Sequence, residues 1–174
     1  IPFDVFDALR SIKSDSLITA RVLLLDKVNI LADSQVFSGS KLHAADPDIS
    51  HIFSFEIMDG SLKDFVENER TVILSSSIAK KYFGTSQSQG KEIRISTFGD
   101  TILFTVAAVY KDYPQNSHEE FNTIIRFDSS SLQSLNFNPE NSGVYGNLRK
   151  GNKASVESIV NRLHQSDELT YSIQ

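Results

Sequence analysis

Residues 83–91 have the sequence FGTSQSQGK, in which two glycines and a lysine resemble a phosphate-binding loop at first sight. Such a loop needs four residues between its glycines, and a Ser or Thr after the lysine to hold magnesium. Here five residues separate Gly84 from Gly90, and Glu92 follows Lys91. A helical pattern also precedes the stretch, whereas a phosphate-binding loop follows a strand. The stretch therefore predicts a helix end and a turn, and it argues against a nucleotide site.

The helix expected before this stretch has a clear start and a clear end. Thr71 to Leu74 is an apolar run that predicts a buried strand, and Ser75 or Ser76 is suited to cap the helix that follows. Gly84 is predicted to be the C-terminal cap, because only glycine adopts a positive φ without penalty. The apolar residues of this helix share one face: Ile78, Ala79, Tyr82 and Phe83.

Patterns for strands and helices mix along the chain without the regular alternation of a doubly wound sheet, so the expected fold class is α+β. Gly39 is expected to mark a turn, and Gly99-Asp100 a hairpin. Strands are predicted at residues 17–25, 28–31, 42–45, 71–74, 93–95, 101–110, 121–127, 144–148 and 169–173, with a short strand ending near residue 60. Helical segments are predicted near residues 2–12, 49–53, 76–83 and 156–163.

Length and composition exclude several classes of protein. With 174 residues the chain can form one ordinary domain or two small lobes. The net charge of −5 and the scattered basic residues argue against a nucleic-acid partner, because phosphate binding requires a basic stripe. No apolar run approaches the roughly 18 to 20 residues that cross a bilayer. The absence of cysteine removes disulfides, thiol catalysis and zinc sites with thiolate ligands.

The start of the sequence predicts that the chain is a piece of a longer protein. It begins at Ile1, has Met58 as its only methionine and carries no signal peptide. The composition leaves the cellular compartment open, since a lack of cysteine fits an oxidising space without requiring one.

Two groups of residues could be drawn as sites that contain a histidine. Asp46, Asp48 and His51 suggest a metal site, but no helical register unites them and no second histidine lies nearby. A solvated turn before a helix explains the same residues. His118 with Glu119 and Glu120 could be a base with an orienting acid, although an exposed polar loop explains them as well. The chain has four histidines in all: His43, His51, His118 and His164.

Two further groups also have simpler explanations. Ser75, Ser76 and Ser77 lie between a strand and a helix, where a nucleophile elbow places its serine, but the flanking glycines of that motif are missing. Glu67 and Glu69 lie in a charged segment for which a solvated face is the default. The sequence thus predicts no catalytic residue, no cofactor-binding residue and no metal ligand, and the protein is not expected to be an enzyme.

An ordered series of short motifs resembles the periplasmic core domain of MacB-like ABC transporter permeases of the FtsX-like type, especially the large permeases of Bacteroidetes-type bacteria. The similarity covers roughly residues 45 to 127. Each motif is unspecific alone, and their order carries the resemblance. The series comprises Ala45-Asp46-Pro47-Asp48, Phe53-Ser54-Phe55, Gly60, Thr71–Ser75, Ala79–Gly84, Gly90-Lys91, Phe104–Pro114 and Asn116-Ser117-His118.

The sequence departs from the family pattern at two places. Ala107-Ala108 stands where the family commonly has Val-Gly or Thr-Gly, which puts the local strand geometry in question. Residues 86–89, with the sequence SQSQ, replace the usual acidic loop that contains proline.

The resemblance implies a two-lobed domain that is inserted between two transmembrane helices and protrudes into the periplasm as part of an inner-membrane protein. A porter-like lobe of βαβ units would comprise residues 1–48 and 119–174, and a β-rich sabre-like lobe residues 49–118. The implied role is to relay ATP-driven motion during export or efflux. The implied partners are a second permease domain, a cytoplasmic ATPase subunit or domain, and a periplasmic protein or exported substrate. Residues 56–70 and 128–142 are the expected contact loops.

Two other functions remain open from the residues alone. A free-standing periplasmic ligand-binding module would need a deep apolar pocket of roughly 300 Å³ or more. A serine hydrolase-like domain would need Ser75 or Ser76 within hydrogen-bond reach of His118.

Overall fold

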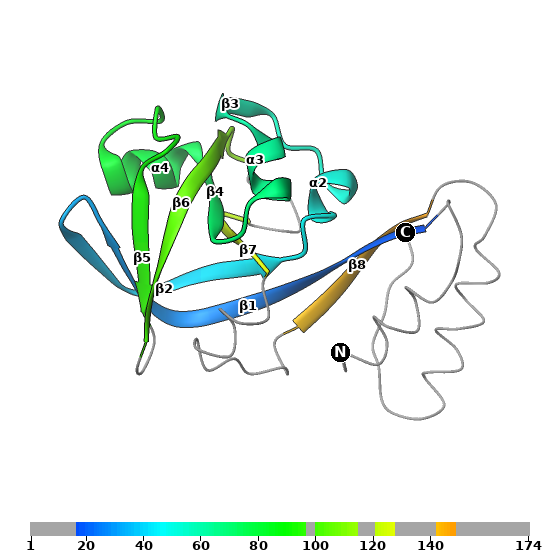
Figure 1. Cartoon of the computed structure of the whole chain (residues 1–174), viewed down its shortest axis with the longest axis horizontal. Helices are drawn as coiled ribbons and strands as arrows, with labels where there is room; N and C mark the ends of the chain where they lie inside the picture. Colours follow the sequence, from blue (N-terminus) through cyan, green and yellow to red (C-terminus); the bar gives the residue numbers. More distant parts are fainter. Residues whose placement is uncertain (1–16, 97–99, 115–120, 128–141, 149–174) are drawn as a thin grey trace.

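The computed structural model describes residues 17–96, 100–114, 121–127 and 142–148. The chain enters the described part through β1 (Leu17–Ala32) and β2 (Gln35–Ala45), followed by α2 (Ile49–Ile52), β3 (Ile57–Gly60) and α3 (Leu62–Glu67). Next come β4 (Thr71–Ser75), α4 (Ser76–Phe83), β5 (Glu92–Ser96) and β6 (Thr101–Tyr110), and last β7 (Thr123–Arg126) and β8 (Ser142–Leu148). Strands outnumber helices among these elements, as Figure 1 shows.

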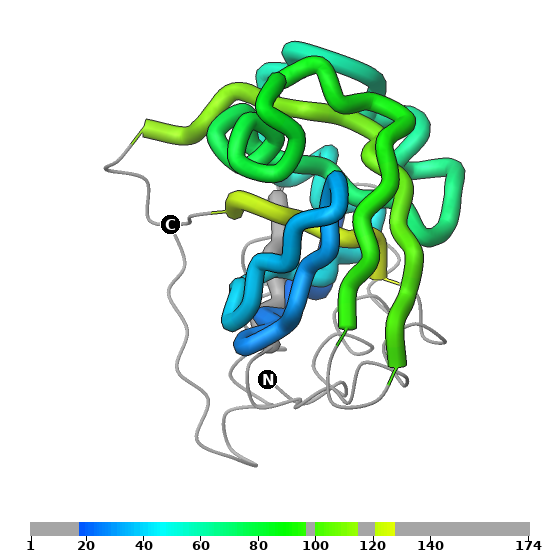
Figure 2. The backbone as a smooth tube through the Cα atoms, turned by 90° about the vertical axis from the view of Figure 1, so that its left-hand side faces the viewer, coloured from blue at the N-terminus to red at the C-terminus, as the bar shows by residue number. Residues whose placement is uncertain are grey.

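The strands form one mixed sheet that closes on itself. Its order is β2-β7-β4-β6-β5-β1-β8, and β2 also pairs with β1, so the ladders return to β1 and form a ring of β1, β2, β7, β4, β6 and β5. Within the ring, β2 with β7 and β4 with β6 are parallel, and the other pairs are antiparallel. Figure 2 shows the β1–β2 hairpin in blue beside the β5–β6 hairpin in green. The predicted α+β class is confirmed.

Strand β1 extends beyond the ring (Figure 1), and its first half pairs with β8 from Leu17↔Leu148 to Leu23↔Ser142. We call this two-stranded ribbon the stem, defined as residues 17–23 and 142–148. The sequence pattern predicted two strands where β1 is a single one, and that prediction is wrong. Asp26 and Lys27 form a bulge in which Lys27 has φ 59° and its amide donates to Asp26 Oδ1 at 2.9 Å, so two polar residues interrupt the pattern without ending the strand.

The predicted turn at Gly39 is also wrong. The chain reverses at Asp33 and Ser34, which both have positive φ, 44° and 67°, as in the two-residue turns that match the twist of a hairpin. Gly39 lies inside β2 with φ 66°, where the pairing with β1 is irregular. Gly39 therefore belongs to a β-bulge within β2 and not to a turn.

Two apolar clusters lie on opposite faces of the ring. The inner cluster receives residues from α4 and from every ring strand, among them Leu23, Leu42, Ile125, Leu74, Val106 and Ile95. The outer cluster includes Val22, Ala45, Ile73 and Ile124 of the strands, and it is covered by Ile49 of α2 and Phe65 of α3. The two clusters fix which face of each strand points inward, because side chains alternate along a strand.

Helix α3 lies in a segment that was expected to be a loop. Ser61 caps it by accepting from the Lys63 amide at 3.1 Å, and Phe65 is fully buried. A helix of six residues has little intrinsic stability, so the burial of Phe65 holds it in place.

Other predictions are confirmed: the buried strand predicted at 71–74, which is β4, the helix at 76–83, the β5–β6 hairpin and the short strand that ends near Gly60. Several lie outside the described residues: the helices near 2–12 and 156–163, the strand at 169–173, and residues 128–141 of one predicted contact loop. Strands from both predicted lobes share the ring, and the division into 1–48 with 119–174 and 49–118 stays a prediction.

Candidate functional site

In the loop between Gly84 and Gly90, two backbone amides bind the carboxylate of Asp59, a residue of the same chain. Asp59 Oδ2, on β3, accepts hydrogen bonds from the amides of Ser88 at 2.6 Å and Gln89 at 2.8 Å. Consecutive backbone amides of this kind are what a phosphate-binding loop offers its ligand. The sequence predicted only a helix end and a turn here, and that prediction was incomplete, because the stretch also fastens β3 to the segment before β5.

The same loop is tied to β6 and to α4. The Gly90 amide donates to Val106 O at 2.8 Å, and the Val106 amide donates to Lys91 O at 2.8 Å. Lys91 Nζ lies 4.8 Å from the centre of the Phe83 ring, a cation–π contact. Gly84 has φ 72° and caps α4, as predicted. The side chain that resembled a phosphate-binding lysine therefore packs against the helix end.

Replacing Asp59 with Ala is expected to lower the free energy of unfolding by about 2 kcal/mol, because two loop amides lose a charged acceptor. Urea denaturation measures the change. Asp48→Ala is the control, since the exposed Asp48 side chain makes no capping hydrogen bond, and its effect should stay within about 0.5 kcal/mol. Equal effects of the two substitutions would contradict the role of Asp59.

Of the three serines at the start of α4, Ser75 caps the helix, and Ser76 and Ser77 donate to Asp112. Ser75 Oγ accepts from the Ile78 amide at 3.4 Å. Asp112 accepts from Ser76 Oγ at 2.8 Å, from Ser77 Oγ at 2.7 Å and from the Ser77 amide at 3.1 Å. The predicted capping role of Ser75 is confirmed, and His118, the base of the hydrolase hypothesis, lies outside the described residues.

Asp112 is a structural partner of the start of α4 that the sequence analysis missed. Burial alone would raise the pKa of its carboxyl, but the hydrogen bonds from Ser77, Ser76 and Ser75 outweigh burial and hold the pKa below its usual value. A carboxylate beside a helix N-terminus is also favoured by the helix dipole. Asp112 and the serines are 35 and 36 residues apart, so the only sequence signal was an Asp close after a strand.

Asp46, considered above as a metal ligand, forms an ion pair with Arg21. Arg21 Nη2 donates to Asp46 Oδ1 at 2.8 Å, and both Nε and the backbone amide of Arg21 donate to Oδ2 at 2.9 Å. The Asp46 amide donates back to Arg21 O at 3.1 Å. Across the described ranges, no three His, Asp or Glu side chains gather closely enough to hold a metal ion.

This ion pair joins three strands at one end of the ring. Arg21 lies on β1, Asp46 directly follows β2, and the Arg21 guanidinium lies 4.0 Å from the centre of the Phe127 ring, directly after β7. The Phe127 amide donates to Ala45 O at 2.7 Å. The Ala45-Asp46 motif thus has a structural role as a clasp between strands.

His43 lies on β2 in the outer cluster region and is mostly buried. Its ring stands edge-on to Phe121 with the centroids 4.9 Å apart, and its Nδ1 is buried without a hydrogen-bond partner in the described structure. On neighbouring β7, Nε and Nη1 of Arg126 are buried in the same way. Burial lowers the pKa of His43 to about 4, because the positively charged ring would be poorly solvated inside the protein.

The neutral His43 predicts a loss of stability in mild acid. Because its folded pKa lies below the ordinary value of 6.5, its contribution is complete above about pH 6.5 and is lost as pH falls toward 4. The loss should reach up to about 3 kcal/mol. Urea denaturation at several pH values should show this slope in the wild type and a flatter one in His43→Phe. An unaltered slope in His43→Phe would contradict the prediction.

Comparison with known proteins identifies the family to which this chain belongs. The model of the MacB-like periplasmic core domain matches residues 3–165, which is nearly the whole chain. The chain belongs to this family of MacB-like periplasmic core domains. It is thus a periplasmic domain of a MacB-like ABC transporter permease, and the resemblance carried by the motif series is confirmed. No curated protein matched the chain.

Solved structures share the fold of this MacB-like domain at low sequence identity. A domain of a putative permease from Porphyromonas gingivalis has a TM-score of 0.67 at 20% identity, covering 94% of this chain and 69% of the other. The periplasmic region of MacB from Actinobacillus actinomycetemcomitans has a TM-score of 0.67 at 13% identity, covering 92% and 73%. The extracellular domain of the noncanonic ABC-type transporter YknZ from Gram-positive bacteria has a TM-score of 0.61 at 13% identity, covering 94% and 82%.

The membrane context follows from the family. The family is that of membrane-embedded ABC transporters. Within the described residues, no helix is both long enough and apolar enough to span a bilayer.

The two departures from the family pattern have local explanations. Ala107 is the extra residue of a bulge, since Val72 pairs with Val106 and Ile73 with Ala108. Its carbonyl turns toward β3 and accepts from the Ser61 amide at 3.0 Å. The SQSQ loop at 86–89 supplies the amides that bind Asp59.

Proposed function

We propose that this MacB-like domain is a non-enzymatic relay that carries ATP-driven motion from the membrane to the periplasm during export or efflux. The observation that carries the proposal is the pairing of β1 with β8 in the stem. Leu17 lies opposite Leu148, so the strand that leads into the ring and the strand that leaves it run side by side at the far end (Figure 1). A domain inserted between two membrane helices needs its entering and leaving segments close together.

The stem continues into the ring without a break. Strand β1 has 16 residues, which at about 3.3 Å per residue is roughly 50 Å. Residues 17–23 of β1 pair with β8, residues 22–32 pair with β2, and residues 29–32 pair with β5, so Val22 and Leu23 belong to both the stem and the ring. Because one continuous strand belongs to both parts, a tilt of the stem would displace the ring as a unit. The closed ladder resists internal shear, since each ring strand is hydrogen-bonded on both sides.

The partners in this proposal are a second permease copy, a cytoplasmic ATPase subunit or domain, and a periplasmic protein or exported substrate. The two-lobe division at residues 49 and 118 belongs to the same proposal. Residues 56–70 are offered as a contact surface, and within them Met58 is 55% exposed although it is apolar.

The test uses the full permease with its ATPase in lipid nanodiscs. Lys63 is exposed on α3 and the chain has no cysteine, so Lys63→Cys in a cysteine-free background gives one spin label per domain. Trapping with ATP and vanadate should change the distance between the labels of the two copies. The labelled domain on its own, separated from the permease and the ATPase, should show no change in its spin-label signal when ATP is added. An unaltered distance in a permease that hydrolyses ATP would overturn the relay.

A further inference from the structure

One part of the outer face of the ring is not covered by α2 or α3. Two rows of side chains cross it, as the strand registers define. In the first row Val36 lies opposite Leu31, Leu31 opposite Arg94, and Arg94 opposite Leu103. In the second row Glu92 lies opposite Thr105. We call these six residues the β5 face.

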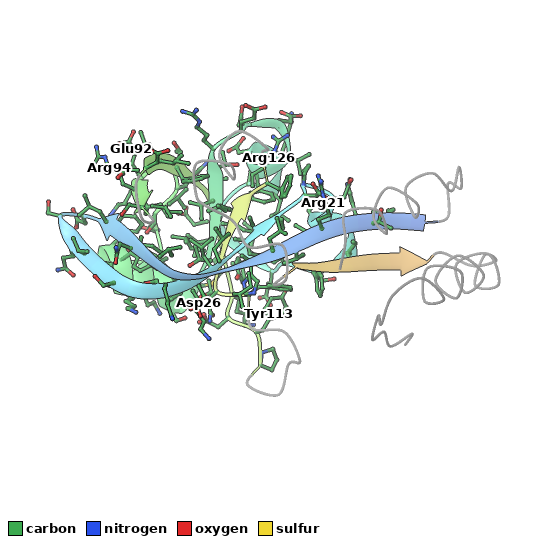
Figure 3. The ribbon with its side chains drawn as sticks, turned by 90° about the horizontal axis from the view of Figure 1, so that it is seen from below. Arg21, Asp26, Glu92, Arg94, Tyr113 and Arg126 are labelled. Carbon is green, nitrogen blue, oxygen red and sulfur yellow. The ribbon has the colours of Figure 1, made fainter. Side chains whose placement is uncertain are left out.

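The β5 face exposes apolar side chains beside charged ones. Val36 is 63% exposed and Leu103 is 38% exposed, and both are among the large apolar residues that the described chain leaves on its surface. Glu92 and Arg94 are exposed too, and Figure 3 shows them next to each other at one margin of the molecule. Neither side chain forms an ion pair with another described residue. A contiguous row of apolar residues rimmed by polar ones marks a candidate surface for a protein partner.

The arrangement of the charges on the β5 face favours a second copy of the chain as the binding partner. Glu92 and Arg94 are two residues apart on β5, so both point outward from the same face. If two β5 faces meet about a two-fold axis perpendicular to the strands, β5 of one copy runs antiparallel to β5 of the other. Arg94 then faces Glu92 of the second copy, and Glu92 faces its Arg94. A parallel arrangement would oppose like charges.

We propose that the β5 face binds the β5 face of a second copy in this antiparallel arrangement. The apolar residues of the first row, Val36, Leu31 and Leu103, supply the buried area, and the two ion pairs fix the orientation. The face is smaller than the roughly 20 to 30 residues per side of a stable interface, so a weak dimer with a Kd of roughly 10 μM to 1 mM is expected. Anchoring in one membrane would raise the effective concentration of the two copies.

This inference deepens the proposed function by assigning a surface to the second permease copy, and it rests on that function for its place in the transporter. A charge-swap cycle on the chain tests it by sedimentation equilibrium at low salt, up to about 1 mM protein. Glu92→Arg alone or Arg94→Glu alone should weaken self-association at least about tenfold, because like charges then meet. The double variant should restore it. Glu69→Arg, an exposed change of the same charge outside the face, should have little effect.

Each outcome of the cycle has one meaning. Rescue by the double swap supports the antiparallel β5 dimer, and circular dichroism and urea denaturation should show that all four variants fold like the wild type. A wild type that stays monomeric to the highest concentration would overturn the inference. So would a double variant as weak as the single ones. Neither failure alters the spin-label distances that test the relay, so the two proposals are separable.

Discussion

Changing Gly60 to Ala is expected to lower the free energy of unfolding by about 4 kcal/mol or more, which would leave little folded protein. Gly60 ends β3 with φ 76°, a conformation that side chains disfavour. A Cβ atom there would lie 2.2 Å from Ala107 O and 3.0 Å from Ala108 Cα. Both are backbone atoms of β6, so relief of the clash requires β3 to separate from the sheet.

Gly84 provides a matched control. It has φ 72°, close to that of Gly60, but no atom lies within 4 Å of the position that a Cβ would take there. Gly84→Ala should therefore cost only about 1 kcal/mol, the penalty of the left-handed conformation. The difference between the two variants in urea denaturation isolates the clash with β6. If both variants lost the same amount, the close approach of β3 to β6 would be wrong.

Changing Asp46 to Ala is expected to lower the free energy of unfolding by about 3 kcal/mol. The Asp46 and Arg21 side chains are only 11% and 20% exposed, so the substitution would leave a largely buried guanidinium without its carboxylate. The Arg21 amide would lose its acceptor as well. Because the pair joins β1 to the end of β2, the loss should also speed hydrogen exchange of the amides that pair these strands near Val22 and Ala45.

The ion pair of Lys111 with Glu56 is the control for that prediction. Its N–O distance is 3.1 Å, but its side chains are 62% and 71% exposed. Water screens such a pair, so Glu56→Ala should cost less than about 0.5 kcal/mol. Asp46→Asn should fall between the two, because it keeps an acceptor oxygen but loses the charge. An effect of Asp46→Ala as small as that of Glu56→Ala would refute the clasp.

Local patterns predicted the parts of the fold whose cause is local. The helix at 76–83 was placed correctly because its cap residue Ser75, its apolar face and its final Gly84 lie within ten residues of one another. The β5–β6 hairpin was placed for the same reason, since alternation and turn residues are adjacent in sequence. The patterns gave wrong predictions where a β-bulge interrupts the alternation of a strand, at Asp26-Lys27 and at Gly39. A bulge and a turn favour the same residue types, so the pattern indicated the end of a strand where the strand continues.

The candidate site followed the same rule. The spacing of the glycines was enough to reject a nucleotide-binding loop at residues 83–91. It could not show that the Asp59 carboxylate accepts hydrogen bonds from the amides of Ser88 and Gln89. Asp46 was noticed as a carboxylate, but its partner Arg21 lies 25 residues earlier and on another strand. The burial of His43 was not visible in a strand of mixed polarity.

The sequence by itself determined the α+β class, the family and the position of α4, because these depend on residue order and on contacts within one or two turns. Only the tertiary structure decided that the sheet closes into a ring, that Asp59 and Asp112 hold backbone amides and hydroxyls, and that β1 and β8 form the stem. The physical reason is that these contacts join residues roughly 30 to 130 positions apart. Their register is set by which apolar faces pack together, and no short stretch of the chain encodes it.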